Sequence, residues 1–476
     1  MSRTKIVATA GPACASPEML KKLALAGVDV FRLNMSHGAR DEHSRVIAAI
    51  RKISVETGRP IGILCDLSGP KIRVDVMDND GVELIVGAKI TLTPEPGHGT
   101  ASRATINHEH LADDIITGHR LLLDDGLLEL QTEAIDGRDV ICRVVRGGIL
   151  RSHKGVNAPD SHLSVESMTD KDRDDMAFGL EADVDMFAAS FVRNAEDVNV
   201  FRRHMESLGA NLPLISKVEM SEAVANLEAI VEASDGAMVA RGDLGVEIAI
   251  EQVPLVQKRL ISLCNRAGKP VITATQMLDS MIRSPRPTRA EATDVANAIL
   301  DGTDAVMLSG ETAVGAYPLE TVETMNRIAG AAESLLKVEP PFSMRRDLAP
   351  LANTPDAIAR ATVLVAHDLH LRHILCLTFS GSTARLVARN HPDAIVLAYT
   401  PVPRTARQLC LTWGVVPMSP PHGKTDAETF DDLVEEALQF FRDKAMLDPN
   451  EKIVTTGGVP LGRTGTTNML RISDAP

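Results

Sequence analysis

The sequence predicts an α/β protein built on a (β/α)8 TIM barrel. Short apolar runs alternate with longer amphipathic segments, and eight of these runs have the length and composition of strands. Alternating strands and helices favour parallel pairing with helical crossovers, and eight such units close a barrel. An open doubly wound sheet is the alternative. The barrel is favoured because no glycine-rich dinucleotide fingerprint follows the first strand.

Each barrel element is expected from a local signal. The strands are predicted near residues 6–9, 28–33, 61–65, 184–189, 214–217, 237–240, 271–274 and 305–308. Helices are predicted at 19–26, 41–56, 194–209, 221–233, 253–267 and 318–336. Before the first helix, Ser16 supplies a capping hydroxyl and Pro17 suits the first helical position, while Gly27 can end that helix.

Two further domains are predicted around the barrel, which would comprise residues 1–69 and 161–340. Residues 70–160 interrupt the pattern with short alternating runs and turn clusters, which predict a small inserted β-barrel domain. Such an insert can act as a cap over the barrel mouth. Pro340-Pro341 marks a linker. Residues 350–476 predict a C-terminal α/β domain with a mainly parallel sheet, including helices at 354–369 and 382–390 and strands at 373–379, 394–399, 452–456 and 467–473.

Composition narrows the function classes. The net charge of −14 argues against a nucleic-acid binder, and aromatic residues are only 3% of the chain. The six cysteines are scattered without a CxxC pair, which indicates neither a zinc site nor a disulfide framework and fits a reducing cytoplasm. No apolar run has membrane-spanning length, and no signal peptide is recognised. A cytoplasmic protein without a membrane partner is expected.

Polar residues gather where the predicted strands end. Reacting groups of a barrel lie at this carboxyl-terminal face. The strand ends supply the following candidates: Arg32, Asn34 and Ser36; Asp66, Lys71 and Arg73; Lys217 and Glu219; Gly242 and Asp243; Thr275; Ser309 and Glu311.

The chemistry of these residues points to phosphoryl transfer. Strand alternation places Lys217 and Glu219 on one face, and Asp243 adds a second carboxylate from the next strand. A structural salt bridge is the alternative, but two carboxylates suit Mg²⁺ and leave the lysine free to pair with a phosphoryl group. Arg32 and Arg73 are candidate phosphate clamps, although single arginines are more often surface residues. Neither a GxxxxGK[ST] loop nor an HRD and DFG pair is present.

Several segments resemble pyruvate kinase signatures. They run through the whole chain in the family's order: RLNMSHG at 32–38, ISKVE at 215–219, MVARGDLGVE at 238–247, ATQML at 274–278 and MLSGETA at 307–313. Two further segments, DDGL at 124–127 and KGVN at 154–157, resemble the family's cap, and GTTN at 465–468 resembles its C-terminal domain. The short bacterial form is the most similar, since no N-terminal extension precedes the first strand.

The resemblance implies a role for each matched position. Lys217 would stabilise the transferring phosphoryl group between phosphoenolpyruvate and ADP, and Glu219 and Asp243 would hold Mg²⁺ or Mn²⁺. The backbone at Gly242 and Asp243, with Thr275, would hold the substrate carboxylate. The remaining implied roles are phosphate contacts for Arg32 and Arg73, and a proton relay that converts enolpyruvate to pyruvate for Thr275, Ser309 and Glu311. A second Mg²⁺ would arrive with ADP, and ATP and pyruvate would be the products.

One departure from the family pattern concerns the monovalent cation. Potassium-dependent members usually carry DTKGPE where this chain has DLSGPK at 66–71. The potassium pocket would comprise Asn34, Ser36, Asp66 and the Leu67 carbonyl. Lys71 places an ammonium where the potassium charge would act, so the chain is predicted to be potassium-independent, like the family's lysine-bearing branch.

The predicted C-terminal domain offers a second site. The turn formed by Thr378, Ser380, Gly381, Ser382 and Thr383 is rich in hydroxyls and glycine, which suits a phosphate cradle. A helix start without a ligand is the alternative. The family binds sugar-phosphate or nucleotide effectors in this domain, and it is tetrameric, so an effector and a homotetramer are expected.

Two other functions fit parts of the pattern. A barrel enzyme of the citrate lyase type also places carboxylates around Mg²⁺, but it lacks the inserted β-domain and the TQML segment at 275–278. A non-catalytic metabolite sensor is the other, and the intact set of Lys217, Glu219, Asp243 and Thr275 argues against it.

Overall fold

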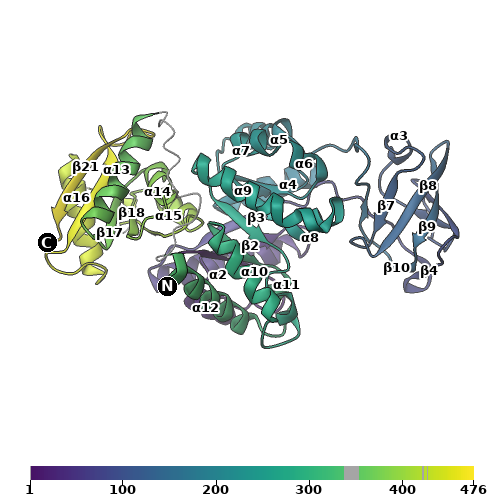
Figure 1. Cartoon of the computed structure of the whole chain (residues 1–476), viewed down its shortest axis with the longest axis horizontal. Helices are drawn as coiled ribbons and strands as arrows, with labels where there is room; N and C mark the ends of the chain where they lie inside the picture. The colour runs from purple at the N-terminus through teal and green to yellow at the C-terminus, as the bar shows by residue number, and fades with distance from the viewer. Residues whose placement is uncertain (1, 337–352, 421–422, 426) are drawn as a thin grey trace.

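The computed structural model describes residues 2–336, 353–420, 423–425 and 427–476. The chain forms three bodies in a row, with the barrel in the centre, the inserted cap on one side and the C-terminal domain on the other (Figure 1). The predicted Pro340-Pro341 linker lies outside the described residues.

A closed barrel of eight parallel strands forms the centre, as predicted, in the order β1-β16-β15-β14-β13-β12-β3-β2. Pairing of β1 with β16, in register from Lys5 with Ala305, closes the ring. The strands are β1 (Lys5–Thr9), β2 (Val30–Asn34), β3 (Gly62–Asp66), β12 (Met186–Ala189), β13 (Leu214–Val218), β14 (Gly236–Ala240), β15 (Val271–Ala274) and β16 (Ala305–Leu308). Nearly every residue in them is buried, because helices cover the outside and side chains fill the inside.

Helices surround the barrel and begin at recognisable caps. Ser16 accepts a hydrogen bond from the Met19 amide at the start of α1, and Gly27 ends that helix with φ of 123°. The outer helices are α1 (Pro17–Ala26), α2 (Arg40–Thr57), α4 (Asp170–Glu181), α5 (Ala195–Ser207), α9 (Val253–Ala267), α10 (Arg289–Leu300) and α12 (Pro318–Leu336). The single helix predicted at 221–233 is divided into α6 (Ser221–Ala225) and α7 (Leu227–Ala233). The break falls at Asn226, whose side-chain amide donates to the Arg193 and Glu222 carbonyls.

The insert between β3 and β12 is rich in β-structure. The strands expected to form a small β-barrel make a six-stranded sheet in the order β11-β7-β8-β9-β5-β6, and β10 pairs with β4. They are β4 (Val82–Leu84), β5 (Lys89–Thr93), β6 (Arg103–Thr105), β7 (Arg120–Leu123), β8 (Leu128–Asp136), β9 (Asp139–Arg146), β10 (Gly148–Leu150) and β11 (Val156–Asn157), with one short helix, α3 (Leu111–Asp114). They enclose a separate apolar core, so the cap packs as its own unit.

The C-terminal domain has a five-stranded sheet in the order β19-β18-β17-β20-β21, parallel except for the last pair. This agrees with the predicted, mainly parallel sheet. Its strands are β17 (His373–Leu377), β18 (Ile395–Tyr399), β19 (Val415–Met418), β20 (Lys452–Gly458) and β21 (Thr467–Asp474). Its helices are α13 (Thr354–Asp368), α14 (Ser382–Ala388), α15 (Pro403–Leu409) and α16 (Phe430–Asp443).

The segment after α15 closes the base of the barrel, where the strands begin. Cys410 and Leu411 are buried in one cluster with inward-facing barrel residues such as Ile215 and Ile272. The Lys5 ammonium donates to the Val415 carbonyl at 2.7 Å, which joins β1 to β19. The C-terminal domain therefore supplies the bottom layer of the barrel core.

All six cysteines are buried and free. Among the described helices, none has both the length and the apolar character needed to span a bilayer.

Candidate active site

Four charged side chains meet at the carboxyl ends of β2, β3 and β13. The Lys217 ammonium lies 3.2 Å from Glu219 Oε2 and 3.5 Å from Asp66 Oδ1. Arg32 Nε donates to Asp66 Oδ2 at 2.6 Å. Asp66 and Glu219 are each only 1% exposed, so this is a buried network of two cations and two carboxylates. The structure thus brings together residues that the sequence separates by up to 187 positions, from Arg32 to Glu219.

Ser190 joins this cluster and was missed by the sequence analysis. Its hydroxyl accepts from Lys217 Nζ at 2.7 Å and donates to the Leu67 carbonyl at 2.7 Å. The next amide, that of Phe191, donates to Glu219 Oε1 at 2.6 Å, with Phe191 in the left-handed region at φ of 57°. Ser190 directly follows β12, so the strand-end rule that found the other residues would also have found this one.

The protonation states follow from burial and from neighbouring charges. Burial disfavours a charged Lys217, yet the carboxylates of Asp66, Glu219 and Asp243 hold its pKa above the usual value. Burial raises the pKa of Glu219 to about 7, although Lys217 opposes that shift. Burial also acts on Asp66, but Arg32 and Lys217 outweigh it and lower the pKa of that carboxyl. The surrounding carboxylates therefore favour the charged form of Lys217, while burial makes Glu219 easier to protonate than an ordinary glutamate.

Glu219 and Asp243 offer oxygens suited to a hard cation. Glu219 Oε2 is buried and has no hydrogen-bond partner, whereas the Asp243 side chain is 37% exposed and lies in the short helix α8 (Arg241–Glu247). Within the described segments, no group of three or more His, Cys, Asp or Glu side chains is arranged to hold a metal. Two carboxylates fit Mg²⁺ nonetheless, because this ion keeps waters and substrate oxygens in its remaining positions.

Thr275 joins β15 to α8 in a strained backbone conformation. Its φ is 66°, and that of Gln276 is 55°, both in the left-handed region that a β-branched residue rarely adopts. The Thr275 hydroxyl accepts from the Gly242 amide at 2.7 Å and donates to the Ala274 carbonyl at 2.6 Å. Such strain costs about 1–3 kcal/mol per residue and is concentrated at functional sites.

Ser309 and Glu311 form a second buried group after β16. The Glu311 carboxylate accepts from the amides of Ser309 at 2.7 Å and Leu278 at 3.2 Å, and burial raises its pKa. The Ser309 hydroxyl oxygen is buried without a hydrogen-bond partner. A free hydroxyl beside a carboxyl whose pKa burial raises is suited to passing a proton.

The residues proposed for a monovalent cation are partly engaged with one another. Asn34 Oδ1 accepts from the Ser36 amide at 3.1 Å, and the Leu67 carbonyl already accepts from Ser190. The Lys71 ammonium lies 3.5 Å from Asp243 Oδ1. The structure therefore places Lys71 beside a candidate metal ligand.

A different lysine lies between the loops that follow β2 and β3. The Lys171 ammonium donates to the Met35 carbonyl at 2.6 Å and to Ser68 Oγ at 3.2 Å, and it pairs with Asp175. Because Lys171 comes from the first turn of α4, no local pattern indicated that its side chain reaches these loops. It fixes the two loops to each other.

Arg73 makes its contacts with the cap. Its guanidinium donates to the His153 carbonyl at 2.9 Å, and its amide donates to Asn107 Oδ1 at 2.6 Å. The structure does not bring Arg73 into the buried cluster around Lys217.

The predicted C-terminal site lines a pocket. The Thr378 hydroxyl accepts from the Gly381 amide at 2.9 Å, and the Thr383 hydroxyl shares a 2.7 Å hydrogen bond with Thr467. The opposite wall is the loop between β20 and β21, which contributes Arg463, the one charged side chain of this lining in the described part of the chain. Hydroxyls and a guanidinium are suitable donors for an anion.

Comparison with known proteins gives one consistent family. The family model described as "Pyruvate kinase, barrel domain" matches residues 1–322, and "Pyruvate kinase, alpha/beta domain" matches residues 356–473. Pyruvate kinase of Geobacillus stearothermophilus is 46% identical over 473 residues, covering 99% of this chain and 80% of that protein. Pyruvate kinase of Clostridium acetobutylicum is 44% identical over 475 residues, which is 99% of both chains. Pyruvate kinase 2 of Synechocystis sp. is 46% identical over 474 residues, or 99% and 79% of the two chains.

Proposed function

Because the chain belongs to the pyruvate kinase family, we propose that its barrel mouth transfers a phosphoryl group from phosphoenolpyruvate to ADP. The observation that carries this proposal is the buried Lys217 ammonium, held by Ser190 Oγ and two carboxylates at the open end of the barrel. A fixed cation at this point stabilises the negative charge of a phosphoryl group in transit, since phosphoryl transfer depends mainly on positioning and electrostatics.

Glu219 and Asp243 would hold the divalent ion, Mg²⁺ or Mn²⁺. When bound, that ion neutralises negative charge on the substrate phosphate. The buried Glu219 Oε2 supports this role, because it accepts no hydrogen bond and has only the Lys217 ammonium, at 3.2 Å, beside it, which leaves it able to bind a further cation. A second Mg²⁺ would enter with the nucleotide.

The other residues of the mouth would bind substrate and handle a proton. Arg32 would contact the phosphate, and the backbone of Gly242 and Asp243 with the Thr275 hydroxyl would orient the carboxylate. Thr275, Ser309 and Glu311 would relay the proton to the enolpyruvate carbon. Arg73 contacts the cap, so we propose that it reaches the phosphate only when the cap moves toward the barrel.

The direct test is a coupled assay for pyruvate. The purified full chain should convert phosphoenolpyruvate and ADP to pyruvate and ATP with Mg²⁺ or Mn²⁺, and a chelator should abolish the reaction. Glu219→Gln should lower the rate while leaving ADP binding intact, because it removes a carboxylate that is proposed to hold the divalent ion. Full activity of Glu219→Gln would contradict the proposed metal site.

We further propose that the reaction needs no potassium, with Lys71 in place of the ion. Asn34, Ser36, Asp66 and Leu67 would form the pocket in a potassium-dependent enzyme. The Lys171 ammonium on the same loops supports the proposal, because it already stabilises their oxygen-rich arrangement. A rate that rises several-fold when potassium is added to a sodium- and ammonium-free assay would refute it.

The C-terminal pocket is proposed to bind a phosphorylated effector, a sugar phosphate or a nucleotide. Thr378, Ser380, Gly381, Ser382 and Thr383 would surround the phosphate, with Arg463 opposite. Thr383→Glu should abolish activation by a sugar-phosphate panel and leave the basal rate unchanged. An unaltered response would show that the hydroxyl cluster only starts a helix. A cytoplasmic homotetramer remains the family expectation, to be tested by light scattering.

A further inference from the structure

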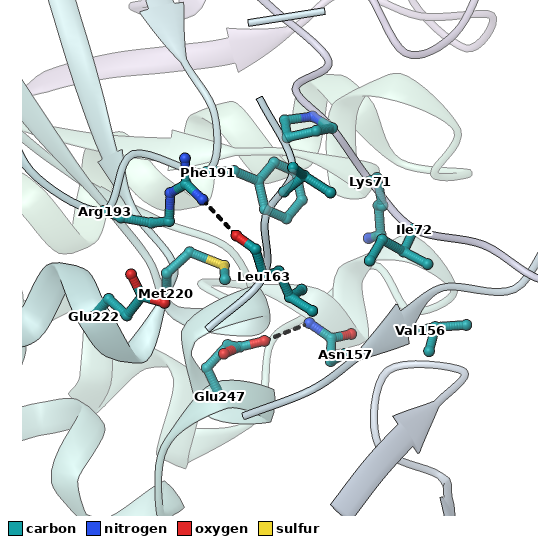
Figure 2. Close-up of a pocket in the computed structure, with 12 residues that line it drawn as sticks. Lys71, Ile72, Val156, Asn157, Leu163, Phe191, Arg193, Met220, Glu222 and Glu247 are labelled. Atoms are coloured by element: carbon teal, nitrogen blue, oxygen red, sulfur yellow. Dashed lines mark hydrogen bonds between the residues drawn. The ribbon is translucent and has the colours of Figure 1, made fainter. Parts of the chain in front are cut away.

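The short helix α8 contacts both segments of chain that connect the barrel to the cap. The outgoing segment follows β3 and includes Pro70, Lys71 and Ile72, and the returning segment runs from Val156 to Leu163. Figure 2 shows the two segments facing each other across a pocket that also contains Phe191 and Met220. Motion of the cap relative to the barrel must pass through this hinge.

The returning segment is held to the barrel by short, partly buried hydrogen bonds. Asn157 Nδ2 donates to Glu247 Oε1 at 2.7 Å, and Glu247, the last residue of α8, is 6% exposed (Figure 2). Arg193 donates to the Leu163 carbonyl at 2.9 Å and is itself fixed by Asp197. Two hydrogen bonds of normal length, each partly shielded from water, make this side of the hinge the firmer one.

The outgoing segment is held to α8 by a weaker contact. Lys71 Nζ lies 3.5 Å from Asp243 Oδ1, beyond a normal hydrogen bond, and the two side chains are 29% and 37% exposed. The Lys71 side chain crosses Gly155, where an added Cβ would come within 3.1 Å of Lys71 Cε. Asp243 and Glu247 are four residues apart on α8 and therefore share one face of the helix.

We infer that Lys71 is a latch that a divalent metal ion displaces. In the free protein the ammonium neutralises Asp243; a metal ion on the same carboxylate would repel it and release the Lys71 side chain from α8. The backbone of the outgoing segment stays paired with the returning one, because the Val156 amide donates to the Ile72 carbonyl and the Val74 amide donates to the Lys154 carbonyl, both at 2.9 Å. The Asn157–Glu247 hydrogen bond stays in place and serves as the pivot. Lys71 is then free to move toward the loops after β2 and β3. This inference rests on the proposed metal site and adds a coupling between metal loading and the hinge.

The test is Mn²⁺ binding to the full chain, without substrate or nucleotide, followed by electron paramagnetic resonance. Lys71→Gln should bind Mn²⁺ about threefold more tightly than the wild type, since it removes a partly exposed competing charge. Lys89→Gln is the matched control, because Lys89 pairs with Glu133 elsewhere in the cap and its loss should leave the affinity unchanged. Equal or weaker binding by Lys71→Gln overturns the latch.

A second readout separates the latch from the metal site itself. Mn²⁺ should speed amide hydrogen exchange at Lys71 of the wild type, whose amide donates only within the same turn, to the Gly69 carbonyl at 3.0 Å. Lys71→Gln should already exchange fast at this position without metal. Peptides covering residues 156–158 should stay protected in both. If Asp243→Asn binds Mn²⁺ as the wild type does, the proposed metal site is wrong, and the latch falls with it. If Asp243→Asn weakens Mn²⁺ binding but Lys71→Gln has the affinity and exchange rates of the wild type, the metal site stands and the latch is wrong.

Discussion

The two ends of the barrel are built from the same eight strands but differ in how their buried polar groups are hydrogen-bonded. At the mouth, Lys217 lies among carboxylates, Glu219 Oε2 has no hydrogen-bond partner and Thr275 is strained. At the base, Leu411 fills the barrel interior, and the buried Asp304 carboxylate accepts from the Trp413 and Val271 amides, both at 3.0 Å. The mouth has a buried carboxylate oxygen that accepts no hydrogen bond, whereas the Asp304 carboxylate at the base accepts one at each oxygen. Substitutions at the mouth should therefore change activity, and those at the base should change stability.

The largest effect is expected for Lys217→Met. Loss of the ammonium should lower kcat by about a thousandfold, because the developing charge loses its principal donor. The melting temperature should change little, since Asp66 keeps Arg32 and Glu219, with a pKa already near 7, can take up a proton. A coupled pyruvate assay and thermal unfolding measure the two quantities.

Lys5→Met is the control from the other end of the barrel. Lys5 is also a buried strand lysine, 6% exposed, but it bonds to Val415 and lies 3.9 Å from Asp29 at the base. The Lys5→Met variant should have a lower melting temperature than the wild type and an unchanged kcat. If Lys5→Met lost as much activity as Lys217→Met, the assignment of activity to the mouth and of stability to the base would be wrong.

Leu411→Ala should be the strongest test of the base. Leu411 is fully buried in the barrel interior, so the cavity left by the substitution should lower the free energy of unfolding by about 2–5 kcal/mol. The basal kcat should stay within twofold of the wild type. Leu25→Ala, at a position that is 61% exposed, should cost less than about 0.5 kcal/mol in the same urea titration. A small effect at Leu411 would show that the C-terminal domain covers the base without stabilising it.

The next effect is the pH dependence of the free energy of unfolding that the buried Asp304 carboxyl causes. Burial raises the pKa of Asp304 to about 7, against 3.8 for an ordinary aspartate, although its two amide donors oppose the shift. Between these values the native state holds a proton that the unfolded chain releases. Stability from this group is therefore full below pH 3.8 and is lost as pH rises toward 7, at up to about 1.4 kcal/mol per pH unit. Urea unfolding between pH 4.5 and 8 should give a flatter profile for Asp304→Asn than for the wild type; parallel profiles would exclude this titration.

The sequence was a good guide to the mouth because strands and their ends are local features. Apolar runs located the eight strands, and polar residues that directly follow them lie at one face in any parallel barrel. Ser190 follows the same rule, because it directly follows the fourth strand of the barrel, β12. The Lys71–Asp243 contact was not predictable, since it depends on how the outgoing hinge segment crosses α8.

The base could not be predicted from the sequence for a related reason. Leu411 and Trp413 are separated from their barrel partners by about a hundred residues or more, and an apolar residue after a helix is equally suited to its own domain. Nothing in local periodicity indicates that this segment enters a barrel built by an earlier part of the chain. Lys171 was missed in the same way, because a lysine in a helix start normally faces water.

The smallest expected effect comes from Arg404→Ala and marks where the base ends. Arg404 and Arg407 both leave α15 toward the barrel, but Arg404 pairs with Asp183, and the two side chains are 44% and 49% exposed. Arg407 also donates to Asp183, at 3.0 Å, but its Nε donates to Asp185 Oδ1 at 2.6 Å, and the Asp185 side chain is fully buried. Exposed ion pairs contribute about 0.2–1 kcal/mol to stability and are screened by salt. Arg404→Ala should therefore lower the free energy of unfolding in urea by less than about 1 kcal/mol at low ionic strength. In about 1 M salt the variant and the wild type should have almost the same free energy of unfolding. Arg407→Ala, as the buried reference, should lower the free energy of unfolding more at both ionic strengths, because the fully buried Asp185 would keep only Arg51 as a cationic partner. Equal and salt-sensitive losses at the two positions would mean that water reaches Asp185, and the base would then resemble the mouth in leaving its charges accessible.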